Sequence, residues 1–201
     1  MCIPFFGYIV KSTEPKKGFS ILFSSVISLS IFLFINPFSY IGAFFLLIYL
    51  FLFKRTEKLY YLLLSFISFL VAAFNLVGDS LFIATLPIML VSSIFSLMMI
   101  GHWFLVDPTI SRVGMKNIAK SSMFFATMLC LLLITGLITN DISTLYRNII
   151  LGLYISSGIL SLGAYKSLNE TSYTGVMAAT GLSYLSLLVS LGGTGTLILL
   201  P

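Results

Sequence analysis

The pattern of apolar and polar positions along the chain is one of long runs without a charged residue. Six such runs cover most of the sequence: 18–53, 59–78, 80–106, 121–140, 148–165 and 171–201. Each run approaches or exceeds the roughly 20 apolar residues that a helix needs to cross a bilayer. The pattern therefore predicts an all-α membrane protein built from a bundle of transmembrane helices.

The first run is too long for one span, because it covers 36 residues. Asn36-Pro37 lies near its middle and is a typical turn signal, so we divide the run there. With seven spans, ten of the eleven Lys and Arg residues lie on the same side of the membrane, and only Arg147 lies on the other side. If residues 18–53 formed one undivided helix, the same residues would be distributed four on one side of the membrane and seven on the other. By the positive-inside rule, the sequence predicts seven spans with a cytoplasmic N-terminus and an external C-terminus.

The predicted organisation has two parts. Residues 1–17 form an interfacial N-terminal segment, in which residues 1–10 are apolar but too short to cross and either lie at the membrane surface or pack against the bundle. Residues 18–201 form the transmembrane domain. Its seven spans are expected near 19–36, 39–53, 59–78, 81–106, 118–139, 144–165 and 172–199.

Two helix-start signals refine these boundaries. Asp107-Pro108 combines a capping residue with a proline suited to the first helical position, which predicts a short amphipathic surface segment running through Lys116. Ser143 is the expected cap of the sixth span.

Composition agrees with a membrane protein: 59% of residues are hydrophobic and 8% are charged, against roughly 25% charged in a soluble domain. We therefore expect lipid to be the main partner and the bacterial cytoplasmic (inner) membrane to be the location. The net charge of +5 is spread over short loops, which indicates topology and not nucleic-acid binding. Cys2 and Cys130 form no disulfide or redox pattern.

The candidate chemistry gathers at the end of the fourth span, in Gly101-His102-Trp103-Phe104-Leu105-Val106-Asp107-Pro108, which holds the only His and the only Trp. Three roles are open for His102. It is a structural hydrogen-bond donor at a helix contact, with Trp103 anchoring the span in the interfacial belt. It is an axial ligand of haem b, with Trp103 also contacting the cofactor. Or it binds a soft metal such as Cu(I) together with Met98 or Met99, one turn earlier on the helix.

The seventh span carries small and hydroxyl residues at every fourth position. Gly175, Ala179 and Ser183 form one row, and Ser186, Ser190 and Thr194 form another. Such rows favour close helix packing, and a polar pathway is the alternative. The residues of that pathway are Asn75, Asp79, Ser183, Ser186, Ser190 and Thr194. Gly192–Gly195 is a candidate unwound segment, because irregular backbone at membrane depth lines a cavity.

Signatures of catalysis are missing from the sequence, which contains no GxGxxG, P-loop, HExxH or GxSxG motif. No carboxylate or basic residue lies deep in a predicted span, which disfavours an ion-coupled carrier. Two functions remain: a non-catalytic subunit of a larger, respiratory or otherwise energy-converting membrane complex, with other membrane subunits as partners, or a stand-alone channel for a small neutral solute. A haem- or copper-binding protein acting through His102 is a third hypothesis.

The element GHWFLVDP also resembles the GHWYL-type stretch of uncharacterised bacterial multi-span membrane proteins. The resemblance covers this octapeptide alone. It implies a multi-span membrane protein and carries no activity with it.

Overall fold

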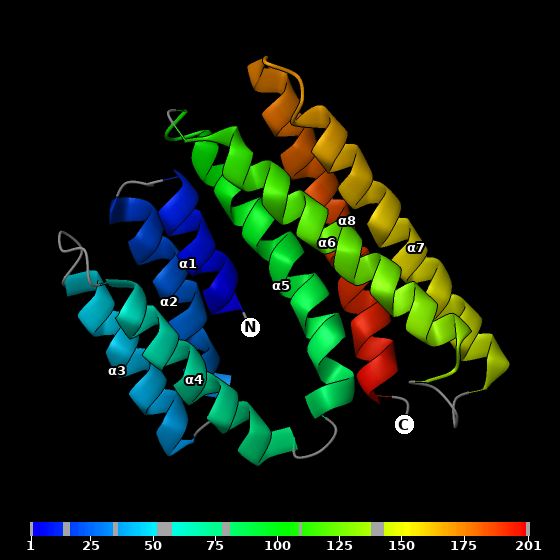
Figure 1. The fold of residues 1–201 in the computed structure, drawn as a ribbon, viewed down its shortest axis with the longest axis horizontal. Helices are drawn as coiled ribbons and strands as arrows, with labels where there is room; N and C mark the ends of the chain where they lie inside the picture. Colours follow the sequence, from blue (N-terminus) through cyan, green and yellow to red (C-terminus); the bar gives the residue numbers. More distant parts are fainter. Residues whose placement is uncertain are drawn as a thin grey trace. The chain divides into compact units, whose positions relative to one another are not determined.

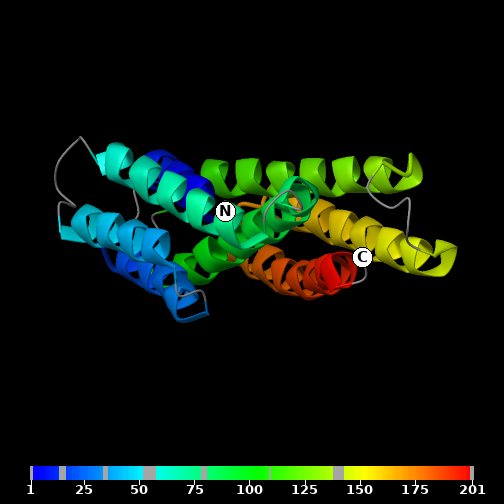
Figure 2. The same cartoon turned by 90° about the horizontal axis from the view of Figure 1, so that it is seen from below.

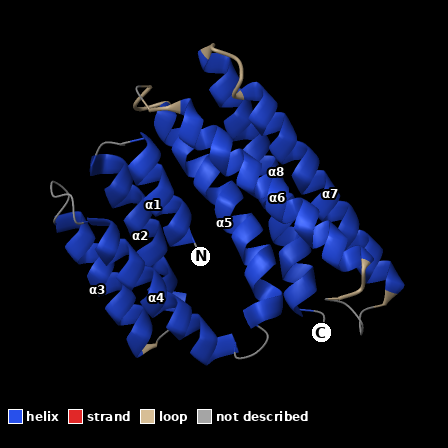
Figure 3. Cartoon of the chain, in the orientation of Figure 1, coloured by secondary structure: helices blue, strands red, loops and turns tan. Residues whose placement is uncertain are grey.

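The computed structural model of the chain describes residues 2–13, 17–33, 36–51, 58–77, 81–108, 110–137 and 143–199, and the described residues hold eight helices and no strand (Figures 1 and 3). The helices are α1 (Cys2–Thr13), α2 (Lys17–Leu33), α3 (Pro37–Phe51), α4 (Lys58–Val77), α5 (Leu81–Phe104), α6 (Arg112–Ile134), α7 (Thr144–Ser167) and α8 (Tyr173–Leu199).

The chain divides into two compact units, residues 1–81 and residues 82–201. Helices α1 to α4 make up the first unit, and α5 to α8 make up the second. Each unit has its own buried core.

An aromatic cluster holds α1 inside the first unit. The Phe6 ring is fully buried and stacks on Phe23 of α2, with centroids 4.7 Å apart and planes 7° from parallel. Its edge contacts Tyr49 of α3 at 5.7 Å and an interplanar angle of 80°. Offset stacking and edge contacts are the favourable geometries for aromatic pairs. The apolar start of the chain is thus a helix that packs against α2 and α3.

Helices α3 and α4 approach each other closely at Gly42. A Cβ atom at Gly42 would lie 2.8 Å from the Phe69 ring, a distance that two carbon atoms do not reach without repulsion. Beside it, the buried Ser65 hydroxyl donates to the Gly42 carbonyl at 2.8 Å. The missing side chain lets the two backbones approach, as small residues do at helix contacts in lipid.

In the second unit α7 lies between α6 and α8 (Figure 2). Side chains from all four of its helices form one apolar core. Leu90 and Ile94 come from α5, and Leu129 from α6 is fully buried with them. The cluster consists of Leu90, Ile94, Ala126, Leu129, Leu133, Ile150, Tyr154 and Leu197.

Four helices of the described residues are long and apolar enough to cross a membrane: Ala84–Phe104, Arg112–Ile134, Thr144–Ser167 and Tyr173–Leu199. All four belong to the second unit. The apolar stretches of the first unit are shorter: Cys2–Lys11, Lys17–Leu29, Pro37–Phe51 and Tyr60–Asn75. The predicted helical membrane protein is therefore observed, with four helices that meet the length for a span.

The predicted division at Asn36-Pro37 is confirmed, because α2 ends at Leu33 and α3 begins at Pro37. The Asn36 side-chain oxygen accepts a hydrogen bond from the Phe38 N–H at 3.0 Å. An Asn cap followed by proline satisfies a free N–H group and fixes the backbone angle at the helix start. Ser143 likewise precedes α7, although its hydroxyl makes no capping bond.

The separate surface segment predicted from Asp107-Pro108 through Lys116 is wrong. Helix α6 runs without a break from Arg112, and Ser111, not Asp107, is its cap, accepting from the Val113 N–H at 3.3 Å. Helix α6 therefore begins six residues before the fifth predicted span, 118–139. The helix ends at Ile134, shortly before Gly136, whose φ of 75° is a conformation that glycine adopts readily and that follows helix ends.

The predicted unwinding at Gly192–Gly195 is also wrong, because α8 is helical through Leu199. A Cβ atom at Gly193 would lie 3.2 Å from a ring carbon of Tyr154. Glycine at this position makes room for a buried aromatic ring of α7 and leaves the helical hydrogen bonds intact.

Candidate functional site

The end of α5 has two different sides. On one side, Gly101 is buried against α8, so close that a Cβ atom would lie 2.3 Å from the Thr180 hydroxyl oxygen. The next residue, His102, is exposed, and Trp103 is half-buried. Glycine is therefore required for packing at the position just before the one imidazole of the chain. This part of the octapeptide combines a sealed helix contact with an outward-facing polar side chain.

The residues after His102 close the helix. The Leu105 N–H donates to the His102 carbonyl at 3.2 Å, and the Val106 and Asp107 N–H groups both donate to the Trp103 carbonyl at 2.9 Å. These bonds satisfy carbonyl groups that a helix end leaves without a partner. Asp107 itself is buried, at 3% exposure, so it belongs to the packing of this turn.

Phe104 ties this end of α5 to the beginnings of α6 and α8. Its ring is buried and lies 6.0 Å from the Tyr173 ring, centroid to centroid. The Arg112 guanidinium lies 5.5 Å from the centre of the same Phe104 ring, within the range of a cation–π interaction. Arg112 also donates to the Glu170 carbonyl. The end of α5 is thus packed against the first residues of α6 and α8.

The proposed metal partners of His102 lie in different surroundings. Met98 is buried, Met99 is half-buried, and the imidazole is exposed. Among the described residues no group of three or more His, Cys, Asp or Glu side chains is placed to hold a metal ion.

The hydroxyl row of α8 forms a buried seam with α7. Four of the six predicted pathway residues belong to this row of α8, and all four are at most 7% exposed. They are Ser183, Ser186, Ser190 and Thr194. The other two are not part of it: Asn75 is exposed on α4 of the first unit, and Asp79 lies outside the described residues.

Ser186 is the centre of the seam. Its hydroxyl donates to the Ser157 carbonyl at 3.1 Å, and its oxygen lies 3.0 Å from the Ser157 hydroxyl and 3.2 Å from the Ser161 hydroxyl. A hydroxyl has one proton to donate and two lone pairs to accept. Ser186 therefore uses its full hydrogen-bonding capacity, with the hydroxyls of Ser157 and Ser161 as donors.

The other seam hydroxyls are also engaged. Ser183 donates to the Ala179 carbonyl at 2.7 Å, and Ser190 donates to the Leu187 carbonyl at 3.0 Å. The Thr194 hydroxyl pairs with the Tyr154 hydroxyl of α7 at 3.3 Å. Ser186 and Thr194 thus bond across to α7 and join the two helices, whereas Ser183 and Ser190 bond to carbonyls of α8 itself.

Sequence reasoning missed the α7 half of this seam. Tyr154, Ser157 and Ser161 follow one another at spacings of three and four residues, which places them on one helix face. That spacing was a usable signal, since the face matches the hydroxyl face of α8. Thr180 was also missed, because its role depends on the approach of Gly101 from a distant helix.

The fold and these contacts define the chain as an integral, multi-pass helical membrane protein. No protein-family model, curated protein or solved structure matches it. The further assignment therefore rests on the residues described above.

Proposed function

We propose that this protein is a non-catalytic integral subunit of a larger membrane complex. The observation that carries the proposal is the two-sided end of α5. Gly101 seals one side against Thr180, while His102 on the next position is exposed. A polar imidazole that faces outward near the end of an apolar helix gains hydrogen bonds when another protein chain covers it.

The interior of the second unit supports the same proposal. Its buried seam hydroxyls already bond within the unit, so this core is suited to holding helices together. The outer faces of the helices carry many large apolar side chains, among them Ile159 at 63% and Leu188 at 67% exposure. Such faces are suited to lipid and to neighbouring spans.

We further propose that α2 to α8 cross the membrane, with the N-terminus cytoplasmic and the C-terminus external in a bacterial cytoplasmic membrane. The support is the distribution of basic residues, ten of eleven on one face in this arrangement. Helix α1 is left out because it is the shortest of the eight described helices, at 12 residues, about 18 Å at the helical rise against a hydrocarbon core of roughly 30 Å. Reporter fusions after Ser167 and after Leu199 test this topology: the first is expected inside and the second outside.

The experiment for the subunit proposal is native electrophoresis of membranes solubilised in mild detergent, with the band identified by mass spectrometry. We expect the wild-type chain in a large assembly and the His102→Ala variant in a smaller species. Leu188→Ala, an exposed change on α8, is the control and is expected to leave migration unchanged. A wild-type chain that migrates alone, or equal migration of His102→Ala and wild type, would contradict the proposal.

Absorbance of haem in the same gel tests the hypothesis of a cofactor at His102. If His102 and a partner chain together hold haem b, the band of the His102→Ala variant is expected to lack the haem absorbance. The channel alternative has less support, because two of the hydroxyls assigned to its pathway, Ser186 and Thr194, are bonded to α7. Its own test is solute uptake by vesicles that contain the purified chain, compared with empty vesicles.

A further inference from the structure

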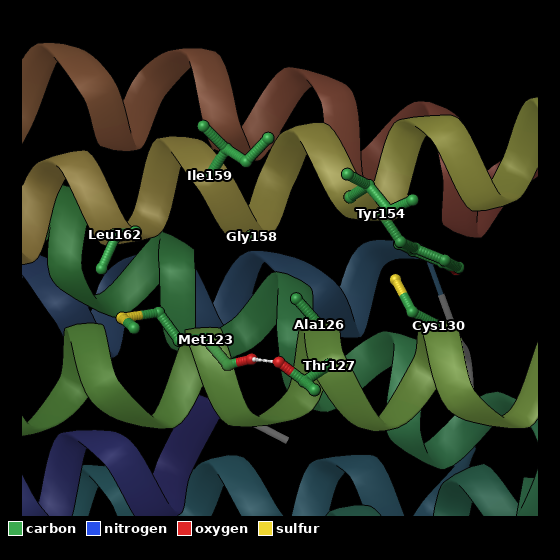
Figure 4. Close-up of a pocket in the computed structure, with 9 residues that line it drawn as sticks. Met123, Ala126, Thr127, Cys130, Tyr154, Gly158, Ile159 and Leu162 are labelled. Atoms are coloured by element: carbon green, nitrogen blue, oxygen red, sulfur yellow. Dashed lines mark hydrogen bonds between the residues drawn. The ribbon is translucent and has the colours of Figure 1, made fainter.

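An apolar groove of about 340 Å³ lies between α6 and α7 (Figure 4). Met123, Thr127 and Cys130 come from the α6 side, and Tyr154 and Leu162 come from the α7 side. The volume is within the range of pockets that hold small molecules. The groove is open to the outside, since the lining residues Ile155 and Ile159 are both exposed.

Small residues make the groove possible. Gly158 lines its floor, and a Cβ atom there would lie 3.4 Å from the Ala126 side chain, an ordinary contact distance. The polar groups of the lining are largely engaged elsewhere: Thr127 donates to the Met123 carbonyl at 2.8 Å, and the Tyr154 hydroxyl pairs with Thr194. The interior of the groove is therefore suited to a hydrocarbon chain.

One end of the groove is basic. Lys120 is three residues before Met123, and its ammonium lies 5.4 Å from the centre of the Tyr165 ring, next to Lys166. Lys116 and Arg112 continue the positive charge along α6. Glu170 is the one acidic residue in the described part of the α7–α8 connection. The charge at this end is therefore positive, and it complements an anionic group placed above an apolar groove.

The groove and the basic residue above it together extend over the depth of one leaflet of a bilayer. The α6 lining runs from Met123 to Cys130, and Lys120 lies three residues before it. The ten residues from Lys120 to Cys130 rise about 15 Å along the helix. This is half of the roughly 30 Å hydrocarbon core. A partner helix would contact the surface over the full core, whereas a phospholipid chain reaches only to the bilayer centre. The dimensions therefore favour a lipid over a helix as the occupant.

We propose that the α6–α7 groove binds one anionic phospholipid, with an acyl chain between Met123 and Cys130 and the phosphate near Lys120 and Lys166. Basic pockets between spanning helices are suited to anionic head groups. The site does not depend on the proposed subunit role, because it uses residues of this chain alone.

The test is native mass spectrometry of the purified full chain after removal of bound lipid. The protein is incubated with dioleoyl phosphatidylglycerol or with dioleoyl phosphatidylcholine, which share acyl chains and differ in head-group charge. We expect one preferred adduct with phosphatidylglycerol. Lys120→Gln is expected to lower that preference about fivefold, while Lys11→Gln on α1 leaves it unchanged.

Gly158→Leu fills the groove and is expected to lower the binding of both lipids. Gly152→Leu is the matched control on the same helix, because a Cβ atom there meets nothing within 4 Å. Thr127→Phe fills the groove from the opposite wall at an exposed position, which keeps the test usable if Gly158→Leu does not fold. Equal adducts for the two lipids, or equal binding by Gly158→Leu and Gly152→Leu, would overturn the proposal. Release of a partner protein by Gly158→Leu without any lipid adduct would overturn it in favour of a helix in the groove.

Discussion

Gly101 of α5 lies directly against Thr180 of α8. A Cβ atom at position 101 would be 2.3 Å from the Thr180 hydroxyl oxygen and 3.3 Å from its Cβ atom. The Thr180 hydroxyl donates to the Val176 carbonyl at 2.8 Å, so it is held in place by its own helix. The contact therefore leaves no room for any side chain at position 101.

Gly101→Ala is expected to destabilise the protein by about 1–3 kcal/mol, the usual cost of forcing an extra carbon into a packed contact. In a Thr180→Ala background the loss is expected to be smaller, because the hydroxyl oxygen is gone and 3.3 Å to Cβ is the tightest remaining distance. Unfolding of the purified protein by SDS in mixed micelles measures both. Equal losses in the two backgrounds would refute the contact as the cause.

Gly175→Ala is expected to be at least as harmful as Gly101→Ala. A Cβ atom at Gly175 would lie 2.5 Å from the Ser167 carbonyl oxygen and 2.9 Å from the Glu170 Cβ. Backbone atoms cannot move aside without shifting the whole α7–α8 connection, so we expect a loss of about 3 kcal/mol.

Gly181→Ala on the same helix is the control for this change, because a Cβ atom there meets nothing within 4 Å. Alanine is favoured over glycine inside a helix by about 0.5–1 kcal/mol, so this variant is expected to be neutral or stabilising. The midpoint of thermal unfolding in detergent compares the two. Similar midpoints for both variants would contradict the close approach at Gly175.

Ser186→Ala tests the centre of the hydroxyl seam. The change removes one donor and the acceptor of two other hydroxyls, Ser157 and Ser161, and is expected to cost about 0.5–1.5 kcal/mol. Ser156→Ala is the matched control, since the exposed Ser156 hydroxyl bonds only to the Gly152 carbonyl of its own helix. SDS unfolding is the measurement. If Ser186→Ala lowers the free energy of unfolding no more than Ser156→Ala does, the seam does not contribute to stability.

Phe6→Ala is expected to release α1 from the first unit. The buried ring contacts Phe23 and Tyr49. Its removal leaves a cavity and is expected to lower the free energy of unfolding by about 3 kcal/mol. Phe44→Ala, at a position with 60% exposure, is the control and is expected to change stability little. Hydrogen exchange of α1 amides distinguishes them: faster exchange in Phe6→Ala alone is the expected result, and unchanged exchange would contradict the packing of α1.

The sequence predicted much of the fold because the strongest signals are local. The limits of charge-free runs located the helices, and Asn36-Pro37 marked the break between α2 and α3, since capping and proline geometry act over a few residues. The start of α6 was misplaced because Asp107-Pro108 also has capping chemistry. Buried Asp107 belongs instead to the turn that closes α5, and Ser111 caps the next helix.

The candidate site was predicted in part. Ser186 and Thr194 were correctly placed on one face of a helix, because helical spacing follows directly from sequence position. Their partners Ser157 and Tyr154 were not identified, since a hydrogen bond between two spans depends on which helices become neighbours. For the same reason the exposed surroundings of His102 could not be derived from its spacing to Met98.

By itself, the sequence determined that lipid is the solvent of this chain, because its long apolar runs contain too few charges for a water-soluble core. It also determined where most helices begin and end. The tertiary structure alone decided that Gly101 meets Thr180 and that the hydroxyls of α8 bond to α7. It also decided that α6 and α7 leave a groove below Lys120. These features depend on the distance and rotation between helices, which packing of side chains from remote parts of the chain sets and no local pattern encodes.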